Sequence, residues 1–437
     1  MKLRSAACGA LHGMAGLPGD KSISHRAALL AASAGGVSRI DGFLRAGVTQ
    51  AMLESLAAAG TAWRWEGDLL VVEGRGRAWF QPTAKPLFCG GSATTIRLLS
   101  GLLAGRPAWR EGPADAEFIL DGSEQLRGRP MGRVIEPLVR MGAAIRSVER
   151  EDCAPLGITP ARLSGIEYRT PVASAQVKSA ILLAALNAEG STTVVERIPT
   201  RDHTERMLEA AGVRVRRSSS SVTVEPAGAL RLEEVDVPGD FSSAAPLLVA
   251  AALVPGSDVT IHDLGVNPRR TGLLDVLERM GARVSIFERR RAGGEPVASV
   301  QVQPGELVAT EIGADEVPGL VDELPLVALL ASHARGETLV SGAGELRVKE
   351  TDRIEAVTDG LQALGARIHS RPDGWTVTGV PARLRGGRVD ARGDHRIAML
   401  GAVAGLASRE GVAIKGADSA AISFPGFYEL LDSVTRR

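Results

Sequence analysis

The sequence predicts an α/β protein of two domains, each built from three copies of one structural unit. The chain has 437 residues, which exceeds the size at which single hydrophobic cores stop growing. Apolar helices, amphipathic helices and short strands alternate along it with a period of roughly 70–80 residues. The pattern Pro-Gly-Asp-x-Ser at residues 18–22 returns at residues 238–242, each time before an apolar helix. We therefore expect domains of residues 19–237 and of 1–18 plus 238–437, with crossovers near 18 and 238.

Two kinds of helix carry this repeat. One kind is apolar all round, which predicts burial on every side; these helices are expected at Arg26–Ala34, Arg97–Ala104, Lys178–Ala188, Ser243–Val254, Pro325–Ala334 and Arg396–Ser408. The other kind is amphipathic, and most of its copies end at a capping glycine; these are expected at Leu53–Gly60, Pro137–Ala143, Met207–Gly212, Val276–Ala282, Leu361–Ala366 and Phe427–Val434.

Sequence segments typical of β-strands follow many of the amphipathic helices. Pairs of short β-rich runs flank turn sequences within residues 63–72, 213–224 and 367–378. Each pair reads as a hairpin. The expected unit is therefore strand, buried helix, strand, amphipathic helix and hairpin, repeated about six times.

Composition excludes several classes of protein. Lys plus Arg and Asp plus Glu both number 51, and aromatic residues make up 3% of the chain, which argues against a nucleic-acid or anionic-membrane partner. No apolar run is long enough to span a membrane. Cys8, Cys89 and Cys153 are scattered, so neither a disulfide framework nor a zinc site is indicated and a reduced cytoplasm is expected. His12 and several glycines break the apolar run of residues 1–17, so a signal peptide is rejected.

The stretch Pro-Gly-Asp-Lys-Ser-Ile-Ser-His-Arg at residues 18–26 is the first candidate site. Ser22 or Ser24 is expected to cap a helix there. Lys21 and Arg26 then lie at or near the positive helix end, which is unfavourable for cations unless an anion binds. The alternative is a solvated Lys and Arg beside a turn, and this motif alone leaves both possibilities open. A P-loop does not fit, because Asp20 separates the glycine from the lysine.

Cations also precede or begin several other helices. A single arginine in such a place is usually solvated, but repetition on buried helices predicts a site for a substrate with more than one anionic group. The cations are Arg97, Arg129, Lys178, Arg353 and Arg396; Gln176 lies near Lys178, and His395 precedes Arg396.

Two acids stand in similar positions. Asp322 and Glu350 lie among these cations, where a carboxylate stays ionised and can accept a proton. The alternatives, an N-cap for Asp322 and a first-turn dipole partner for Glu350, remain open at this point. No Cys/His, Ser/His/Asp or His-Glu-x-x-His arrangement supports a covalent or metal mechanism.

Taken together, these motifs resemble the 5-enolpyruvylshikimate-3-phosphate synthase family over nearly the whole chain. The resemblance rests on residues 18–26, on Arg-Gly-Arg-Pro at 127–130, Ala-Ser-Ala-Gln-Val-Lys at 173–178, Arg-Val-Lys-Glu-Thr-Asp-Arg at 347–353 and Asp-His-Arg at 394–396. It implies a two-domain inside-out α/β barrel of six βαβαββ units, with the active site in the interdomain cleft.

The resemblance also implies a reaction. The enolpyruvyl group of phosphoenolpyruvate passes to the 5-hydroxyl of shikimate 3-phosphate, with release of phosphate, in the biosynthesis of chorismate and the aromatic amino acids. No metal or organic cofactor is implied, and a cytoplasmic monomer without nucleic-acid or membrane partners is expected.

Site residues carry over position by position. The resemblance implies that Asp322 accepts the proton of the attacking hydroxyl, and that Glu350, with Lys21 nearby, protonates and deprotonates the pyruvyl methyl. Shikimate 3-phosphate is expected to contact Lys21, Ser22, Arg26, Ser174, Ala175, Gln176, Arg201, Asp322 and Lys349. Phosphoenolpyruvate is expected to contact Lys21, Ala93, Arg129, Gln176, Arg353 and Arg396, with Thr94, Arg97 and His395 as helpers.

Departures from the family pattern bear on the predicted inhibitor sensitivity and on the predicted substrate contacts. Ala93 stands where the family often has glycine; its methyl predicts resemblance to the glyphosate-insensitive subgroup. Ala175 replaces a common serine, Arg201 lies in an altered segment, and Ile422 precedes Ser-Phe-Pro where many members have lysine. The alternatives are the sibling enolpyruvyl transferase acting on UDP-N-acetylglucosamine, and a non-catalytic binder of phosphorylated metabolites.

Overall fold

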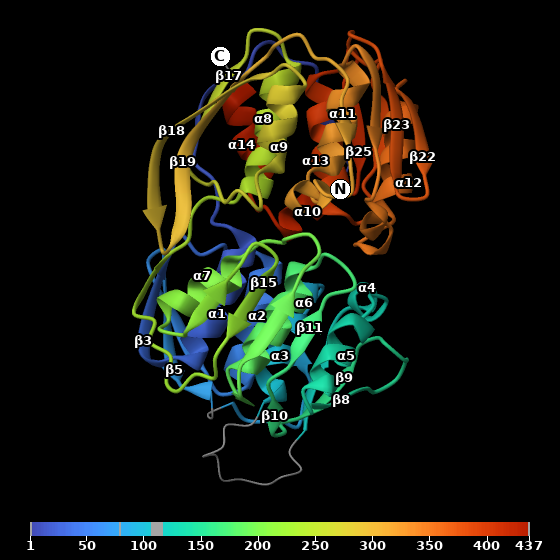
Figure 1. The fold of residues 1–437 in the computed structure, drawn as a ribbon. Coiled ribbons are helices and arrows are strands. Elements are labelled where there is room, and N and C mark those ends of the chain that lie inside the picture. Colours follow the sequence, from blue (N-terminus) through green and yellow to red (C-terminus); the bar gives the residue numbers. More distant parts are fainter. Residues whose placement is uncertain (1, 78–79, 106–116, 436–437) are drawn as a thin grey trace. The chain divides into compact units, whose positions relative to one another are not determined.

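The structure, a computed structural model, describes residues 2–77, 80–105 and 117–435. It divides into two compact units (Figure 1). The N-terminal unit consists of residues 19–237 and 292–295, and the C-terminal unit of 1–18, 238–291 and 296–437. Each unit has a hydrophobic core of its own. The mixed α/β, two-domain fold class predicted from the sequence is confirmed.

The N-terminal unit repeats one sheet topology three times. Each sheet has one parallel pair of strands followed by two antiparallel pairs, in the orders β16-β3-β5-β4, β6-β7-β9-β8 and β11-β13-β15-β14. Since β16 lies at the end of the unit and pairs with β3 near its beginning, the last segment completes the first sheet. The strands are β3 (Gly35–Asp41), β4 (Ala62–Glu66), β5 (Leu69–Arg75), β6 (Leu87–Phe88), β7 (Phe118–Asp121), β8 (Ala144–Ser147), β9 (Leu156–Thr159), β11 (Glu167–Arg169), β13 (Thr192–Val195), β14 (Val215–Arg217), β15 (Ser221–Val224) and β16 (Glu234–Asp236), with a separate pair of β10 (Leu163–Ser164) and β12 (Ala188–Glu189).

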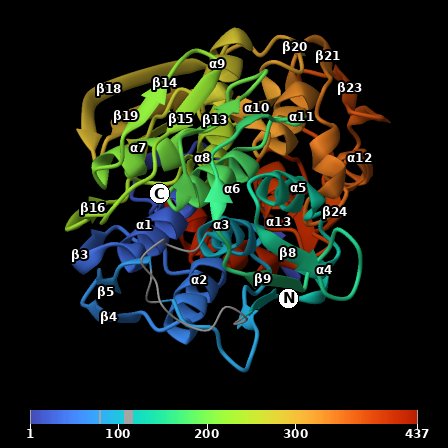
Figure 2. The same cartoon turned by 60° about the horizontal axis from the view of Figure 1, so that its bottom comes forward.

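Three apolar helices form the core of the N-terminal unit. They are α1 (Lys21–Ser33), α3 (Ala93–Ala104) and α6 (Ala175–Ala185), and α3 packs against both others. Figure 2 shows α1, α2 and α3 from the end of the unit. The amphipathic helices are α2 (Gly47–Ala58), α5 (Gly132–Arg140) and α7 (His203–Ala210), with a short α4 (Glu124–Arg127).

The C-terminal unit follows a similar plan, with two four-stranded sheets and a third sheet of three strands. Its sheets have the orders β18-β19-β17-β2, β20-β21-β23-β22 and β1-β25-β24. The N-terminal residues supply β1 (Lys2–Ser5) and β2 (His12–Ala15) to sheets of this unit. The other strands are β17 (Asp258–Gly265), β18 (Arg283–Ala292), β19 (Glu295–Gln303), β20 (Glu311–Ile312), β21 (Gly336–Val340), β22 (Arg367–Arg371), β23 (Gly374–Gly379), β24 (Gly387–Asp390) and β25 (Val412–Lys415).

Its buried helices are α8 (Phe241–Leu253), α11 (Leu324–His333) and α13 (His395–Leu406). They pack against one another and run side by side within the unit (Figure 1). The amphipathic helices are α9 (Gly272–Arg279), α12 (Arg353–Ala363) and α14 (Phe427–Thr435), and shorter helical turns are α10 (Val317–Leu320), η2 (Gly344–Val348) and η3 (Ala417–Ile422). No helix among the described residues is long and apolar enough to cross a membrane.

All twelve helices expected from the sequence are present, but most begin earlier than expected. The expected cap at Ser22 or Ser24 is wrong. Asp20 caps α1 by accepting a hydrogen bond from the backbone N–H of Ile23 at 2.8 Å, and the Ser24 hydroxyl instead accepts from the N–H of Leu44 at 3.0 Å. Aspartate and serine are both good caps, and in this helix Asp20 takes that position.

The three expected hairpins are β4–β5, β14–β15 and β22–β23. Two further hairpins, β8–β9 and β18–β19, are also present. The β18–β19 hairpin was not predicted, because β18 contains the charged residues 288–291, whose side chains are exposed. A charged segment of this kind indicates a loop unless its partner strand is recognised.

Close contact between α3 and α6 depends on Gly101. A Cβ added there would lie 2.1 Å from the carbonyl oxygen of Ala180, which leaves no room for a methyl group. We predict that Gly101→Ala destabilises the protein by about 1–3 kcal/mol, because overpacking forces the helices apart. Thermal or urea unfolding measures this effect.

Gly360 in α12 is the matched control. A Cβ there meets only Val389 side-chain atoms at 3.6 Å and beyond, an ordinary contact. Gly360→Ala is therefore expected to be neutral or to stabilise by about 0.5–1 kcal/mol. Equal destabilisation by both substitutions contradicts the packing argument.

Candidate active site

The first turns of α1 present a buried guanidinium. Arg26 is 4% exposed, and it donates to the hydroxyl of Thr204 at 2.6 Å, to the hydroxyl of Ser179 at 2.7 Å and to the carbonyl of Ser22 at 2.8 Å. Burial lowers the pKa of Arg26 to about 10, so the side chain is still charged at neutral pH. The three acceptors are neutral, and the negative charges of Glu205, Asp20 and Glu295 also act on the guanidinium.

A buried histidine joins α1 to α3. His25 Nδ1 lies 2.7 Å from the carbonyl oxygen of Lys21, and Nε2 lies 3.1 Å from the hydroxyl of Ser92 and 3.1 Å from the carbonyl of Val48. Burial lowers the pKa of His25 to about 4, and the charges of Lys21 and Arg26 add to this effect. Both ring nitrogens face a backbone carbonyl, and a neutral imidazole carries one N–H, so the ring donates to only one of the two carbonyls.

The N-termini of α3 and α6 meet through polar side chains. Ser92 caps α3 and Ser174 caps α6. Gln176 donates to the hydroxyl of Thr94 at 2.9 Å and accepts from Arg97 at 2.6 Å. Arg97 also donates to the carbonyl of Pro130 at 2.8 Å. The structure thus brings Thr94, Arg97 and Gln176 together beside the segment that carries Arg129, as two helix ends with their orphan N–H groups.

Lys178 does not belong to this set. Its side chain is 0% exposed, and its ammonium lies 2.8 Å from Glu196 and 2.8 Å from Glu205. The inclusion of Lys178 among the substrate-facing cations is therefore wrong. Its position on the apolar face of α6 explains why: a buried charge requires partners from the protein itself.

In the C-terminal unit, one arginine is bound to three carboxylates. Arg353, the first residue of α12, donates to Glu350 at 2.6 Å, to Asp394 at 2.8 Å and to Asp322 at 3.3 Å. Burial alone lowers the pKa of Arg353, but the three carboxylates outweigh burial and raise it above its ordinary value. Lys349 lies 3.7 Å from Asp322 and adds a second cation. Asp322 and Glu350 are therefore held beside positive charge, which favours their ionised forms.

The alternatives that the sequence left open for these acids are wrong. Asp352 caps α12 by accepting from two backbone N–H groups, and Glu350 lies before that cap. The residue at the start of α11 is Glu323, without a capping hydrogen bond, and Asp322 precedes it. The side chains of Asp322 and Glu350 are 17% and 21% exposed, so each remains accessible to a substrate.

The start of α13 holds the second cation of this unit. Asp394 caps α13 by accepting from the N–H of Arg396 at 2.8 Å while it also binds Arg353. The guanidinium of Arg396 donates to the carbonyl of Ser242 at 3.2 Å. His395 is 4% exposed, with Nδ1 3.9 Å from Asp394. One buried carboxylate therefore binds the guanidinium of Arg353 and the backbone N–H of Arg396.

The predicted residues thus fall into two groups, one in each unit. Asp322, Lys349, Glu350, Arg353, His395 and Arg396 form the group in the C-terminal unit; Lys21, Ser22, Arg26, Ala93, Thr94, Arg97, Arg129, Ser174, Ala175, Gln176 and Arg201 lie in the N-terminal unit. Arg201 is close enough to Arg26 for its charge to lower the pKa of Arg26. Sequence reasoning missed Ser179, Thr204 and Glu323, because a serine or threonine in a helix, or an acid beside another acid, carries no distinctive signal.

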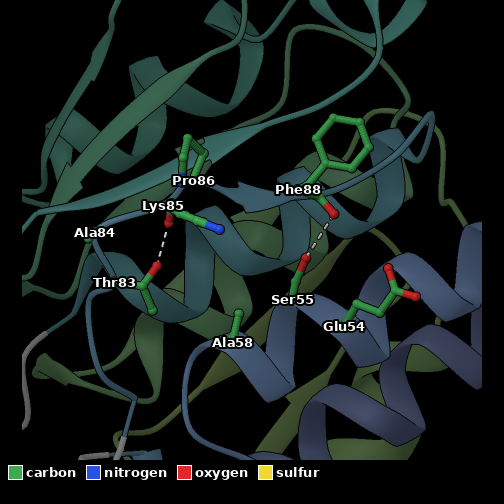
Figure 3. A pocket seen from close by; sticks show the side chains of 8 residues that line it. All are labelled: Glu54, Ser55, Ala58, Thr83, Ala84, Lys85, Pro86 and Phe88. Atoms are coloured by element: carbon green, nitrogen blue, oxygen red, sulfur yellow. Dashed lines mark hydrogen bonds between the residues drawn. The ribbon is translucent and has the colours of Figure 1, made fainter.

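The described part of the chain offers no group of three His, Cys, Asp or Glu side chains suited to a metal ion. A pocket of 390 Å³ lies in the N-terminal unit between α2 and residues 83–88 (Figure 3). Its lining includes Glu54, Lys85 and Phe88 and none of the predicted site residues. This pocket is therefore separate from the candidate site.

These features define an enzyme of the two-domain, repeated α/β class whose substrates are anionic. The family model described as EPSP synthase (3-phosphoshikimate 1-carboxyvinyltransferase) matches residues 6–431. The chain belongs to the EPSP synthase family.

Individual relatives agree with this assignment. Proteins named 3-phosphoshikimate 1-carboxyvinyltransferase from Desulforudis audaxviator and Halorhodospira halophila are 46% and 47% identical to the chain, and the alignments cover 99% and 98% of it and 99% and 95% of the relatives. The solved EPSP synthase of Acinetobacter baumannii superimposes with a TM-score of 0.86 at 37% identity, over 99% of this chain and 98% of that one.

Proposed function

We propose that the chain transfers the enolpyruvyl group of phosphoenolpyruvate to the 5-hydroxyl of shikimate 3-phosphate and releases phosphate. The reaction belongs to the biosynthesis of chorismate and the aromatic amino acids. The observation that carries the proposal is the contact of two accessible acids, Asp322 and Glu350, with one buried arginine, Arg353. A site that only bound anions would gain nothing from acids there, whereas an addition–elimination reaction needs groups that move protons.

Shikimate 3-phosphate is assigned mainly to the N-terminal unit. The buried guanidinium of Arg26 and the first turn of α1, with Lys21 and Ser22, offer positive charge and N–H groups to its phosphate. The capped start of α6, with Ser174, Ala175 and Gln176, offers a second set of donors. Arg201 adds positive charge near Arg26, and Asp322 and Lys349 are assigned to the hydroxyl groups of the ring.

Phosphoenolpyruvate is assigned to the arginines. Arg353 and Arg396 share Asp394 as a support, and Arg129 lies next to Pro130, which binds Arg97. Arginine suits this ligand, because its planar fork matches carboxylate and phosphate oxygens. The other assigned contacts are Lys21, the backbone at Ala93, and Gln176, with Thr94, Arg97 and His395 as supporting side chains.

The acids divide the proton transfers between them. Asp322 accepts the proton of the 5-hydroxyl of shikimate 3-phosphate. At the same time, the oxygen of that hydroxyl forms a bond to the central carbon of phosphoenolpyruvate. Glu350, with Lys21, delivers a proton to the methylene carbon and removes one from the resulting methyl group as phosphate leaves. Arginine guanidinium groups stabilise the negative charge on the departing phosphate. The reaction changes no oxidation state, and we propose that it uses no cofactor.

The proposed enzyme acts as a monomer in the cytoplasm. Cys8, Cys89 and Cys153 are free thiols in the structure, and burial raises the pKa of Cys89. Unpaired buried thiols are typical of a reducing compartment, and both substrates are small metabolites.

Phosphate release tests the proposed function. The wild-type chain is expected to release phosphate only when both substrates are present. Asp322→Asn keeps the size of the side chain but cannot accept the proton, so kcat is expected to fall by about 100-fold or more, the usual contribution of a general base. The KM values are expected to change less.

Asp315→Asn is the control for this experiment, because Asp315 is exposed and lies in the same unit; its kcat is expected to match the wild type. Release of phosphate with UDP-N-acetylglucosamine as the acceptor, or binding of both substrates without turnover, contradicts the proposed reaction.

We further propose that the enzyme resembles the glyphosate-insensitive subgroup. Ala93 is the first residue of α3 and is 3% exposed. Its methyl group therefore occupies space at the helix end assigned to phosphoenolpyruvate. Glyphosate is longer than phosphoenolpyruvate, so the methyl group excludes the inhibitor more strongly than the substrate.

A pair of variants tests this assignment. Ala93→Gly is expected to lower the inhibition constant of glyphosate by about 10-fold or more, the usual effect of one methylene-sized group in a pocket. Ala175→Gly removes the methyl group from the first residue of another helix, α6. This variant tests whether losing a methyl group at any helix start lowers the inhibition constant of glyphosate. Equal inhibition of the wild type and Ala93→Gly contradicts the proposal.

A further inference from the structure

The second copy of the Pro-Gly-Asp-x-Ser motif differs from the first at its helix end. Asp240 caps α8 by accepting from the N–H of Ser242 at 3.1 Å, whereas Asp20 caps α1 by accepting from the N–H of Ile23 at 2.8 Å. In place of Lys21, however, this helix begins with Phe241, which is 0% exposed. The second motif therefore has a helix N-terminus and a serine hydroxyl but no lysine to attract a ligand.

The carboxylate of Glu323 binds the serine of the second motif. It is 0% exposed and accepts a hydrogen bond from the Ser242 hydroxyl at 2.5 Å. Arg270 donates from one nitrogen to both oxygens of Glu323, at 3.2 Å each, and from another to the Ser242 hydroxyl. Where the first motif is assigned to a substrate anion, the second one holds an anion that belongs to the protein.

Glu323 also reaches the site residues of the C-terminal unit. It is the next residue after Asp322, and one of its oxygens lies 3.6 Å from the guanidinium of Arg396. Arg396 donates in turn to the carbonyl of Ser242, the residue that binds Glu323. The carboxylate thus provides negative charge to Arg270 and Arg396 at once.

Such a buried cluster is expensive for the fold. Burying ions costs several kcal/mol each, and well-packed apolar residues often serve equally well for stability. Stability alone is therefore a weak reason for the cluster. Its position supplies a stronger one, because it contacts one residue assigned to phosphoenolpyruvate and adjoins the residue assigned as proton acceptor.

We propose that Glu323, held by Arg270 and Ser242, is a positioning residue that fixes the guanidinium of Arg396 for the reaction. This inference rests on the proposed function. It assigns Glu323 no contact with either substrate. It predicts that loss of the carboxylate charge weakens binding of phosphoenolpyruvate far more than binding of shikimate 3-phosphate.

Steady-state kinetics of Glu323→Gln tests the inference. The amide keeps the volume of the side chain but supplies no negative charge to Arg396. The KM for phosphoenolpyruvate is expected to rise about 10-fold or more, in line with the loss of a buried charge partner. The KM for shikimate 3-phosphate is expected to stay within about threefold, because Arg26 and the helix ends of the other unit are intact.

The double variant Arg270→Met with Glu323→Gln separates positioning from stability. It removes the guanidinium that Glu323→Gln leaves without this partner, so the melting temperature is expected to recover in part relative to Glu323→Gln. Recovery is incomplete, because Asp240, 3.6 Å from Arg270, loses that cation. The KM for phosphoenolpyruvate is expected to stay raised, since Arg396 still has no carboxylate beside it. If Glu323→Gln alone does not fold, the double variant carries the test.

Arg279 and Glu316 provide the matched control, because they form an ion pair of the same residue types at 2.8 Å with both side chains about 40% exposed. Neutralising that pair with Arg279→Met and Glu316→Gln is expected to leave both KM values unchanged. Two results overturn the inference while the wild type is active: a proportional rise of both KM values, or recovery of the KM for phosphoenolpyruvate in the double variant. A wild type that releases no phosphate overturns the proposed function itself.

Discussion

The contact of Arg353 with three carboxylates is the constraint on which the group of candidate residues in the C-terminal unit depends. Asp322, Glu350 and Asp394 precede three different helices, α11, α12 and α13, and all reach one guanidinium that is 2% exposed. Asp394 is fully buried and also caps α13, so it fixes the arginine. The other two acids are partly accessible. The geometry therefore separates a permanent support from two groups that are available for proton transfer.

Both units use the same local device, a capped helix end beside a cation, but they use it differently. In the N-terminal unit, the hydrogen-bond acceptors of Arg26 are two hydroxyls and a carbonyl, while Glu205, Asp20 and Glu295 act on it through their charge. In the C-terminal unit, carboxylates of the protein bind the arginines. The second unit thus carries its own anions, which fits a role in proton transfer as well as in binding.

The fold class and its repeated unit could be predicted from the sequence, because local sequence patterns mark most of the helices and hairpins of the repeat. All-round apolar helices such as α8 and hairpin turns such as that between β22 and β23 need no tertiary information to be recognised. The site was less predictable. Lys178 looks like Arg97 or Arg396 in the sequence, and only the folded chain shows that Glu196 and Glu205 neutralise it. Glu323 and Arg270 lie 53 residues apart, and no spacing rule joins them.

The most direct test of this account is the effect of Arg353→Lys on kcat/KM for phosphoenolpyruvate, with binding of shikimate 3-phosphate measured in parallel by calorimetry. Lysine keeps the positive charge but cannot contact three carboxylates at once through a planar fork. The account predicts a loss in kcat/KM of about 100-fold or more, the range expected when a buried charge network loses a member, and shikimate 3-phosphate affinity within about threefold. A variant that keeps kcat/KM close to the wild-type value contradicts the central role of Arg353.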